Sequence, residues 1–247
     1  MQSAPMQFRE FVSSELARQR YWARSMVGWQ RMASAQPNRA HRALMALEQR
    51  GLLRLLITQN VDGLHSVAGS AKVIDLHGRL DRVICLGCRR VSPRAELQAR
   101  LVEGNAAFLS HDHVARADGD VELSADYASF EVVPCPACGG ILKPDVVFFG
   151  ENVPAARVQV AMDSLVGARA LLIAGSSLMV FSGFRFARAA ARLGVPIIIV
   201  NRGKTRADEL STLRVTGDAG ELFEAALRVM PDTARPQLAS EPGLSQP

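Results

Sequence analysis

Two closely spaced pairs of cysteines constrain the fold of this chain more than any other feature of its sequence. Cys85 and Cys88 form one C-x2-C turn, Cys135 and Cys138 form a second, and 46 residues lie between the turns. Two residues between cysteines let both thiolates reach one ion, so two such turns complete a tetrahedral sulfur site for zinc. Four protein ligands leave no position for water, and the metal would therefore be structural. The alternative is a pair of unrelated buried or redox-active cysteine couples.

The composition narrows the class of protein further. Among 247 residues, 29 basic and 24 acidic side chains give a formal charge of +5, and the arginines are scattered along expected helix faces. This scatter is typical of solvated helices and not of a nucleic-acid footprint. The sequence has no apolar run of the roughly 18 residues that a membrane span needs, and its start does not resemble a secretory signal. We therefore expect a soluble, cytoplasmic protein with no nucleic-acid or membrane partner, and the oligomeric state stays open.

Helices and strands are expected to alternate along most of the chain. Apolar periodicity predicts helices over residues 7–25, between Pro37 and Gly51, and over 93–103, 154–167, 182–193 and a last segment ending near 230. Short apolar strands are expected over 52–57, 170–174, 196–200 and 213–215. This alternation predicts an α/β fold with a doubly wound, Rossmann-like parallel sheet.

The same pattern suggests a division into domains. We expect the Rossmann-like domain to combine residues 1–75 and 141–230, and a small zinc-bearing module with an irregular insertion to occupy 76–140. Residues 231–247 contain four prolines and little apolar periodicity, which predicts a disordered tail.

Polar side chains follow the first expected strand and form the most informative stretch of the sequence. Gln59, Asn60 and Asp62 come directly after the apolar run 52–57, and His77 follows the next short strand. Amide and carboxylate groups at strand ends suit a ribose and a carboxamide, because both ligands offer donors and acceptors. A neutral imidazole beside a ribose hydroxyl would serve as a general base. His65 is the rival histidine, but it is expected to pack or cap on a short helix.

The second half of the chain supplies matching groups at other strand ends. Gly175, Ser176 and Ser177 follow one strand, Asn201 follows the next, and residues 217–220 offer backbone amides at a helix start. Together they describe an adenine nucleotide that lies along the carboxyl ends of parallel strands.

These segments, in this order, resemble the sirtuin (Sir2) family. Residues 58–65 resemble its T-Q-N-[IV]-D-G-L-H motif, residues 76–78 the segment with its catalytic histidine, and the cysteine turns its structural zinc site. Residues 143–151 are similar to K-P-x-V-V-x-F-G-E, 175–178 to G-[TS]-S-L, and 196–201 to a strand ending in asparagine. The match covers about residues 20 to 230. Residues 20–24 and 27–29 look most like the class II branch.

The resemblance implies an NAD-dependent protein-lysine deacylase with one structural zinc ion and an acylated-lysine protein or peptide as substrate. His77 would be the general base, and Asn60 would help hold the ribose and a water. The cofactor-binding residues implied by the motifs are Gln59, Asn60, Val61, Asp62, Gly175, Ser176, Ser177, Asn201, Arg202, Gly203 and Ala219. The implied substrate-binding residues are Val146, Val147, Phe148, Gly150 and Glu151, with Arg20, Tyr21 and Arg24 near the acyl pocket.

One part of the family pattern has no counterpart. Sirtuins open with a strand, a G-A-G-x-S loop that wraps the pyrophosphate, and a segment resembling G-I-P-D-[FY]-R, whereas no G-x-G occurs near the start of this sequence. The expected sheet therefore lacks its first, central strand, whose absence exposes the edges of its neighbours. We expect weak NAD binding and slow turnover by the chain as given.

Three other functions stay open at this point. One is mono-ADP-ribosyl transfer to protein, which this branch resembles closely enough to retain. A second is a catalytically silent, zinc-bearing interaction module. The third, a basic zinc-ribbon protein that binds nucleic acid, is disfavoured because no aromatic and basic surface accompanies the cysteine turns.

The sequence lacks a glycine-rich loop for the pyrophosphate, and this leads to a first prediction. A chain extended upstream to include a glycine-rich loop should bind NAD more tightly than this chain, because the loop and the helix start behind it would supply amides to the pyrophosphate. Isothermal titration of both chains with NAD measures the difference. Equal affinities would contradict the expectation.

Overall fold

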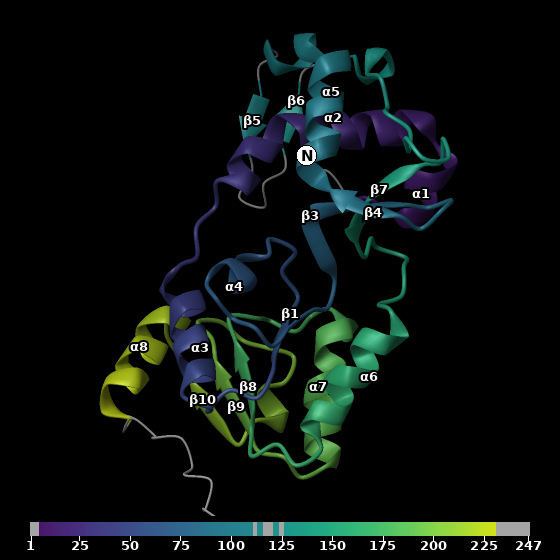
Figure 1. The fold of residues 1–247 in the computed structure, drawn as a ribbon. Helices are drawn as coiled ribbons and strands as arrows, with labels where there is room; N and C mark the ends of the chain where they lie inside the picture. The colour runs from purple at the N-terminus through teal and green to yellow at the C-terminus, as the bar shows by residue number, and fades with distance from the viewer. Residues whose placement is uncertain (1–4, 111–112, 116–120, 124–125, 231–247) are drawn as a thin grey trace, which may run out of the picture.

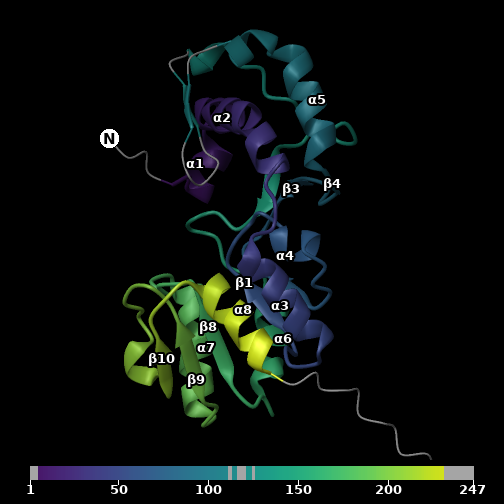
Figure 2. The ribbon, with the colours of Figure 1, turned by 90° about the vertical axis from the view of Figure 1, so that its left-hand side faces the viewer.

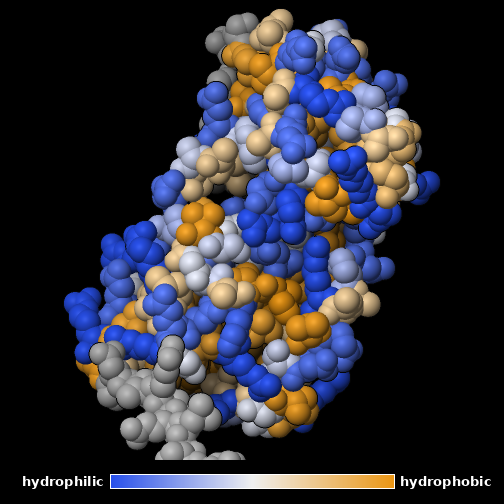
Figure 3. Space-filling view, viewed as in Figure 1, coloured by the Kyte–Doolittle hydropathy of each residue, from blue (hydrophilic) through white to orange (hydrophobic). Residues whose placement is uncertain are grey.

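The computed structural model describes residues 5–110, 113–115, 121–123 and 126–230. The predicted disordered tail, 231–247, lies outside the described residues. The described chain forms an upper and a lower lobe, named as they are oriented in Figure 1, and the space-filling view narrows between them (Figures 1 and 3). Within the described residues, no helix combines the length and the apolar character that a membrane crossing requires.

The lower lobe contains the alternating helices and strands that the sequence predicts. Its helices are α3 (Arg39–Gln49), α4 (Leu64–Val67), α6 (Ala155–Leu165), α7 (Phe181–Arg192) and α8 (Ala219–Val229), with a 3-10 turn η3 (Asp208–Leu210). Its strands are β1 (Leu56–Thr58), β2 (Val73–Asp75), β8 (Leu171–Ala174), β9 (Ile197–Val200) and β10 (Leu213–Val215).

All strand pairs of the lower lobe are parallel. β1 pairs with β2, and β9 lies between β8 and β10. The predicted parallel α/β fold is therefore confirmed, but it is divided between two sheets. In the part of the chain that the structure describes, no strand joins β1 to β8, so each of these strands has one unpaired edge.

Helices cover both faces of the three-stranded sheet. On one face, α7 buries Phe186, Ala187 and Ala190 against Ile197 and Ile199 of β9. On the other face, α3 and α8 lie side by side (Figures 1 and 2), and Ala43 and Phe223 pack against Val200. This arrangement is the doubly wound packing that alternating strands and helices predict.

The start of α3 shows how the sequence fixes one helix end. The side chain of Asn38 accepts a hydrogen bond from the His41 backbone N–H at 3.1 Å, and the His41 ring contacts the Asn38 backbone in return. This reciprocal capping box satisfies amides that a helix start otherwise leaves unpaired. Gly51 then follows the helix with φ +72, a conformation that favours glycine.

The upper lobe is built from a helical pair, a longer helix and antiparallel strands. Its helical elements are α1 (Phe8–Ser13), α2 (Glu15–Ala33), α5 (Arg94–Gly104), η1 (Ala106–Ser110) and η2 (Tyr127–Ser129). Its strands are β3 (Gly78–Cys85), β4 (Val91–Pro93), β5 (His113–Ala115), β6 (Val121–Leu123) and β7 (Leu142–Val146). β3 pairs antiparallel with both β4 and β7, and β5 pairs with β6.

The N-terminal helices and β7 lie in the upper lobe, whereas the sequence placed them in the Rossmann-like domain. Phe11, Trp22 and Met26 are buried in the same core cluster as Val83 and Leu101 of the upper lobe. The reason is apolar burial: the stripe that predicted a helix over 7–25 packs against α5 and β3 and not against the parallel strands. The β3–β7 ladder likewise carries residues 142–146 into the upper lobe.

The predicted single helix over 7–25 is two helices. Ser14 has an extended backbone, and its side chain accepts a hydrogen bond from the Ala17 N–H at 3.1 Å, which caps the start of α2. Serine favours this capping position because its oxygen satisfies a free amide of the first turn. α2 then continues to Ala33, beyond the predicted end.

A buried arginine joins α2 to α5. The guanidinium of Arg94, which is 1% exposed, lies 5.3 Å from the Trp22 ring centre and 4.9 Å from that of Trp29. Its Nη2 also donates to the Ser25 hydroxyl at 3.3 Å. Burial lowers the pKa of Arg94 to about 10, so the side chain stays charged at neutral pH and retains its cation–π contacts.

Candidate active site and metal centre

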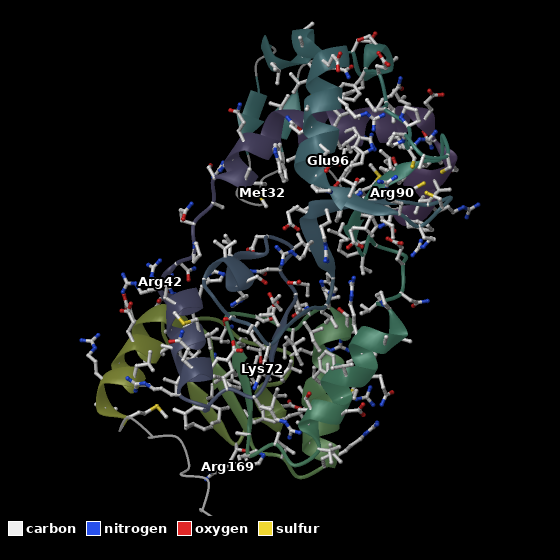
Figure 4. All side chains as sticks on the ribbon, viewed as in Figure 1. Met32, Arg42, Lys72, Arg90, Glu96 and Arg169 are labelled. Atoms are coloured by element: carbon white, nitrogen blue, oxygen red, sulfur yellow. The ribbon has the colours of Figure 1, made fainter. Side chains whose placement is uncertain are left out.

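The four cysteines meet at the end of the upper lobe where β3, β4 and β7 come together. Their sulfur atoms all lie within 4.8 Å of one another, with Cys85 3.5 Å from Cys138 and Cys88 3.8 Å from Cys135. In Figure 4, yellow sulfur atoms gather beside the labelled Arg90. A tetrahedral zinc ion with Zn–S bonds of about 2.3 Å separates its sulfurs by roughly 3.8 Å. The predicted ligands therefore fit one structural zinc ion.

The backbone around the sulfurs is also suited to a metal. A Cβ at Gly140 would lie 3.1 Å from the Cys85 sulfur and 3.2 Å from the Cys138 sulfur, so a side chain there would crowd the ligands. The backbone N–H of Cys88 lowers the pKa of the Cys85 thiol to about 6, which favours the thiolate that binds metal. The close approach of the two sulfurs to Gly140 explains why a glycine follows the second cysteine turn.

The predicted histidine lies at the centre of the second site. His77 follows β2, and its Nδ1 contacts the Gln59 carbonyl oxygen at 3.0 Å while its Nε2 contacts the Ser182 hydroxyl at 2.7 Å. A carbonyl oxygen only accepts, so Nδ1 carries the proton of the neutral ring and Nε2 is the basic atom. Burial lowers the pKa of His77; the hydrogen bond to Gln59 opposes this effect and the Arg157 guanidinium adds to it. The ring is therefore neutral and basic near neutral pH.

The parallel register of β1 and β2 brings the polar residues to His77. Thr58 pairs with Asp75, and the Leu76 N–H donates to the Thr58 carbonyl at 2.9 Å, so residues 59 and 77 leave the sheet together. The Gln59 side chain then reaches across to β8, where the Ser176 hydroxyl donates to Gln59 Oε1 at 3.1 Å. This bond connects the two parallel sheets at their carboxyl ends.

Asn60 and Asp62 form the turn after β1. The Asn60 N–H donates to the Thr58 hydroxyl at 3.1 Å, and its amide lies 3.5 Å from Asp62 Oδ2. The other Asp62 oxygen accepts from the Leu64 N–H at 2.9 Å, at the start of α4. Val61 accepts through its carbonyl from the Leu80 N–H at 2.8 Å. The predicted group 59–62 is thus one turn beside His77.

The turn after β8 has an unusual backbone. Gly175 has φ +60, and Leu178 also lies in the left-handed region with φ +54, where a branched residue is strained. The Ser176 hydroxyl accepts from the Leu178 N–H at 3.2 Å and stabilises the turn. A Cβ at Gly175 would meet no atom within 4 Å, so open space surrounds the end of β8 beside Ser177.

Polar contacts also occupy the ends of β9 and β10. Asn201 donates from its amide to the Gly203 carbonyl at 2.9 Å, and a Cβ at Gly203 would meet open space. At the start of α8, beside Ala219, the Asp218 carboxylate accepts from the Glu221 N–H at 3.0 Å and caps the helix. Arg202 pairs with the same carboxylate at 2.8 Å.

The segment after β7 is tied directly to the histidine. The Val147 N–H donates to the His77 carbonyl at 2.8 Å, and Gly78 pairs with Val146. Glu151 Oε2 then accepts from the Phe148 N–H at 2.7 Å and from the Lys143 ammonium at 2.9 Å. The Lys143 ammonium, which is buried, also donates to the Val146 carbonyl. We name residues 146–151 the clamped segment, and Gly150, with φ +87, forms its turn.

An aromatic wall stands behind the clamped segment. The rings of Phe11, Tyr21 and Phe148 meet edge to face or tilted, with centroids 5.3 to 5.5 Å apart. Burial raises the pKa of Tyr21, so it stays a neutral phenol. Arg20 forms an ion pair with Glu10 at 2.6 Å on the half-exposed surface, whereas Arg24 is half-buried. Tyr21 thus contacts the predicted substrate segment, and Arg20 is held toward α1.

The structure adds two residues that the sequence did not single out. Ser182 contacts the base itself, and a Cβ at Gly183 would lie 2.6 Å from Gln59 Oε1. Both stand at the start of α7, more than 100 residues from His77 along the chain. A serine followed by a glycine at a helix start is common, so the sequence carries no signal that would separate this pair from an ordinary helix cap.

Known proteins with similar sequences belong to the family that the motifs suggest. A family model described as the Sir2 family matches residues 2–182. An NAD-dependent protein deacetylase 2 of Bradyrhizobium diazoefficiens is 56% identical over 224 residues, which cover 90% of this chain and 81% of that protein. An NAD-dependent protein deacetylase 1 of Streptomyces coelicolor is 52% identical over 212 residues, or 85% of this chain and 71% of that protein.

Solved structures agree with the sequence comparison. A structure of Sir2 bound to an acetylated peptide superposes with a TM-score of 0.71 at 28% identity, covering 90% of this chain and 81% of that one. A Sir2 structure with a p53 peptide and NAD+ gives a TM-score of 0.71 at 28% identity and covers 92% and 85% of the two chains.

The cysteine geometry predicts one equivalent of zinc that stabilises the upper lobe. Replacing one ligand, Cys88→Ser, should abolish tight zinc binding and lower the melting temperature, because metal binding contributes directly to folding. Elemental analysis and thermal unfolding of the purified chain measure both effects. The control Arg90→Ser changes an exposed residue of the same turn and should retain the metal. A Cys88→Ser variant with full zinc content would contradict the assignment.

The clamped segment predicts a cost for removing the charge of Glu151. Glu151→Gln retains an acceptor for the Phe148 N–H but leaves the buried Lys143 ammonium without a counter-charge, so the free energy of unfolding should fall by about 1–3 kcal/mol. Urea denaturation measures the change. Glu103→Gln, at an exposed position of α5, is the matched control and should change stability by less than about 0.5 kcal/mol. Equal stability of the two variants would show that the clamp contributes nothing.

Proposed function

Because the chain belongs to the Sir2 family, we propose that it is an NAD-dependent protein-lysine deacylase that acts on acetylated proteins or peptides. The observation that carries this proposal is a neutral, basic His77 nitrogen at the meeting point of two strand ends and the clamped segment. The relatives described above bear the name deacetylase, and nothing in them favours ADP-ribosyl transfer to protein over deacylation.

The strand ends fit a dinucleotide. Gln59 and Ser176 follow strands of the two parallel sheets and are joined by a side-chain hydrogen bond, and open space surrounds Gly175 and Gly203. We propose that residues 59–62 hold the nicotinamide ribose and carboxamide, while Ser176, Ser177 and Asn201 hold the phosphates and the adenosine. When bound, NAD supplies an electrophilic ribose carbon that receives the acyl oxygen as nicotinamide leaves.

The role of His77 in this scheme is to take a proton. Its Nε2 lone pair would accept the proton of a ribose hydroxyl, and the imidazolium that forms is stabilised by the Gln59 carbonyl at Nδ1. Asn60 would hold the ribose and a water for the final hydrolysis. The products are nicotinamide, an O-acyl-ADP-ribose and the free lysine.

The clamped segment would hold the peptide. Its backbone groups lie beside His77, and the ring of Phe148 with Tyr21 forms an apolar wall suited to the methylene chain of an acylated lysine. In this proposal the acyl group would lie between a basic nitrogen and an aromatic surface. Arg24 would line the same pocket.

The proposal includes one structural zinc ion and a cytoplasmic location. Four neighbouring thiols that are not joined as disulfides are typical of a reducing compartment. The zinc ion has no open coordination position in this cluster, so it would support the fold and take no part in the chemistry.

The activity is tested directly with an acetyl-lysine peptide and NAD. Mass spectrometry should detect deacetylated peptide and O-acetyl-ADP-ribose in equal amounts, and His77→Ala should reduce the rate at least about 100-fold, because it removes the general base. Formation of ADP-ribosylated protein without O-acetyl-ADP-ribose would replace deacylation with ADP-ribosyl transfer. Peptide turnover that does not require NAD would overturn the proposal.

The pH dependence follows from the environment of His77. The base works when neutral, so kcat/KM should fall as the pH drops through the pKa of His77, and burial places this limb below the ordinary value of about 6.5. Arg157→Ala removes a cation that lowers this pKa, so the limb should move to higher pH. Arg169→Ala, at the far end of the lower lobe in Figure 4, should leave the limb in place. If neither substitution moves the acid limb of the pH profile, Arg157 does not lower the pKa of His77.

A further inference from the structure

The start of α7 is built against the catalytic pair. The Ser182 hydroxyl lies 2.7 Å from His77 Nε2, and the adjacent Gly183 packs so closely on Gln59 that a Cβ there would lie 2.6 Å from its side-chain oxygen. Gln59 is the residue whose carbonyl holds the other ring nitrogen, Nδ1. Two consecutive residues of α7 therefore contact the base and the group that orients it.

The position of Ser182 is fixed by the core. The same helix buries Phe186, Ala187 and Ala190 in the central cluster of the lower lobe, with 4%, 1% and 0% of their surfaces exposed. Ser182 itself is only 9% exposed. Because a helix with such a face cannot rotate without unpacking, the hydroxyl is held where the His77 ring needs a partner.

Hydrogen-bond chemistry sets the direction of the contact. Nδ1 donates to a carbonyl that only accepts, so the lone pair of Nε2 accepts the Ser182 hydroxyl proton. A serine hydroxyl rotates about a single bond, and it yields this lone pair to a substrate hydroxyl at small cost. Before the substrate arrives, Ser182 keeps Nε2 aimed and hydrogen-bonded in a half-buried place where an unpaired nitrogen is costly.

We propose that Ser182 is a positioning residue for this reaction: it holds His77 with Nε2 as the basic atom until a ribose hydroxyl replaces it. This role rests on the proposed function. It concerns the proton-transfer step and not the earlier departure of nicotinamide, which needs no base. Ser182 should therefore affect one half of the reaction selectively.

The contact itself is tested without turnover. Nuclear magnetic resonance of the full chain with 15N-labelled histidine, with His77 assigned from its absence in His77→Ala, should show a neutral Nδ1–H ring. Its Nε2 resonance should move toward that of a nitrogen without a hydrogen bond in Ser182→Ala, and return in Ser182→Thr. An Nε2 resonance that is the same in wild type and Ser182→Ala would overturn the proposal.

The functional consequence is tested by splitting the reaction. Ser182→Ala should slow deacetylation about three- to tenfold, the effect of losing one hydrogen bond, while nicotinamide exchange into NAD and both KM values stay unchanged. Ser182→Thr should recover most of the rate. Ser164→Ala removes an exposed hydroxyl of α6 that bonds Val160, and should change neither reaction.

The outcomes separate the two proposals. Equal losses of exchange and deacetylation in Ser182→Ala would show a general disturbance of the site and overturn the positioning role. A wild-type chain without any turnover would remove the proposed function, whereas the resonance of His77 would still report whether Ser182 holds the ring.

Discussion

The backbone crossing at His77 and Gly78 is the constraint on which the rest of the site depends. A Cβ at position 78 would overlap the Asp145 carbonyl oxygen, and φ is +83, so only glycine lets β3 and β7 meet here. The same crossing gives the His77 carbonyl to the Val147 N–H. One close approach of two backbones therefore places the base, the clamped segment and the entry into the upper lobe at a single point. The narrow waist of the molecule is therefore where the proposed chemistry would take place.

The low pKa of His77 is a product of this crowded junction. Burial among two strand ends, a helix start and the clamped segment removes water from the ring, and water is what favours the charged form. The Gln59 carbonyl pulls in the other direction because it also stabilises the imidazolium. The balance leaves a base that is neutral when it must accept a proton and still stabilised once it has done so.

Local patterns predicted the parts of this structure that depend on neighbours in the chain. The capping residues before α3, the apolar strands of the lower lobe and the two C-x2-C turns are all read from a few adjacent residues. The placement of α1 and α2 was not predicted. The stripe of Phe11, Trp22 and Met26 shows that one helix face is buried, but not which surface it packs against. Ser182 was missed for the same reason: its contact with His77 joins residues 105 positions apart. Sequence motifs predict His77 as the base, whereas its contact with Ser182 depends on the tertiary fold.

The distance between the metal centre and the base decides how zinc can matter. β3 runs from Gly78 at the site to Cys85 at the cysteine cluster, and β7 covers the same interval from Val146 to Leu142 in four steps, roughly 13 Å at the rise of an extended strand. An ion at the partly exposed cysteine cluster would lie beyond the screening length of about 8 Å at physiological salt, which weakens its electrostatic effect on His77. The link is mechanical: Cys85 pairs with Leu142 at one end of the β3–β7 ladder, and Gly78 pairs with Val146 at the other. A metal at the cysteine end would fix the pairing of Leu142–Pro144 with β3. The pairing of Asp145 and Val146 resumes beyond an irregularity between Arg79 and Val83, and there β7 delivers the clamped segment to the histidine. Zinc would thus act on substrate binding through strand register and not through its charge.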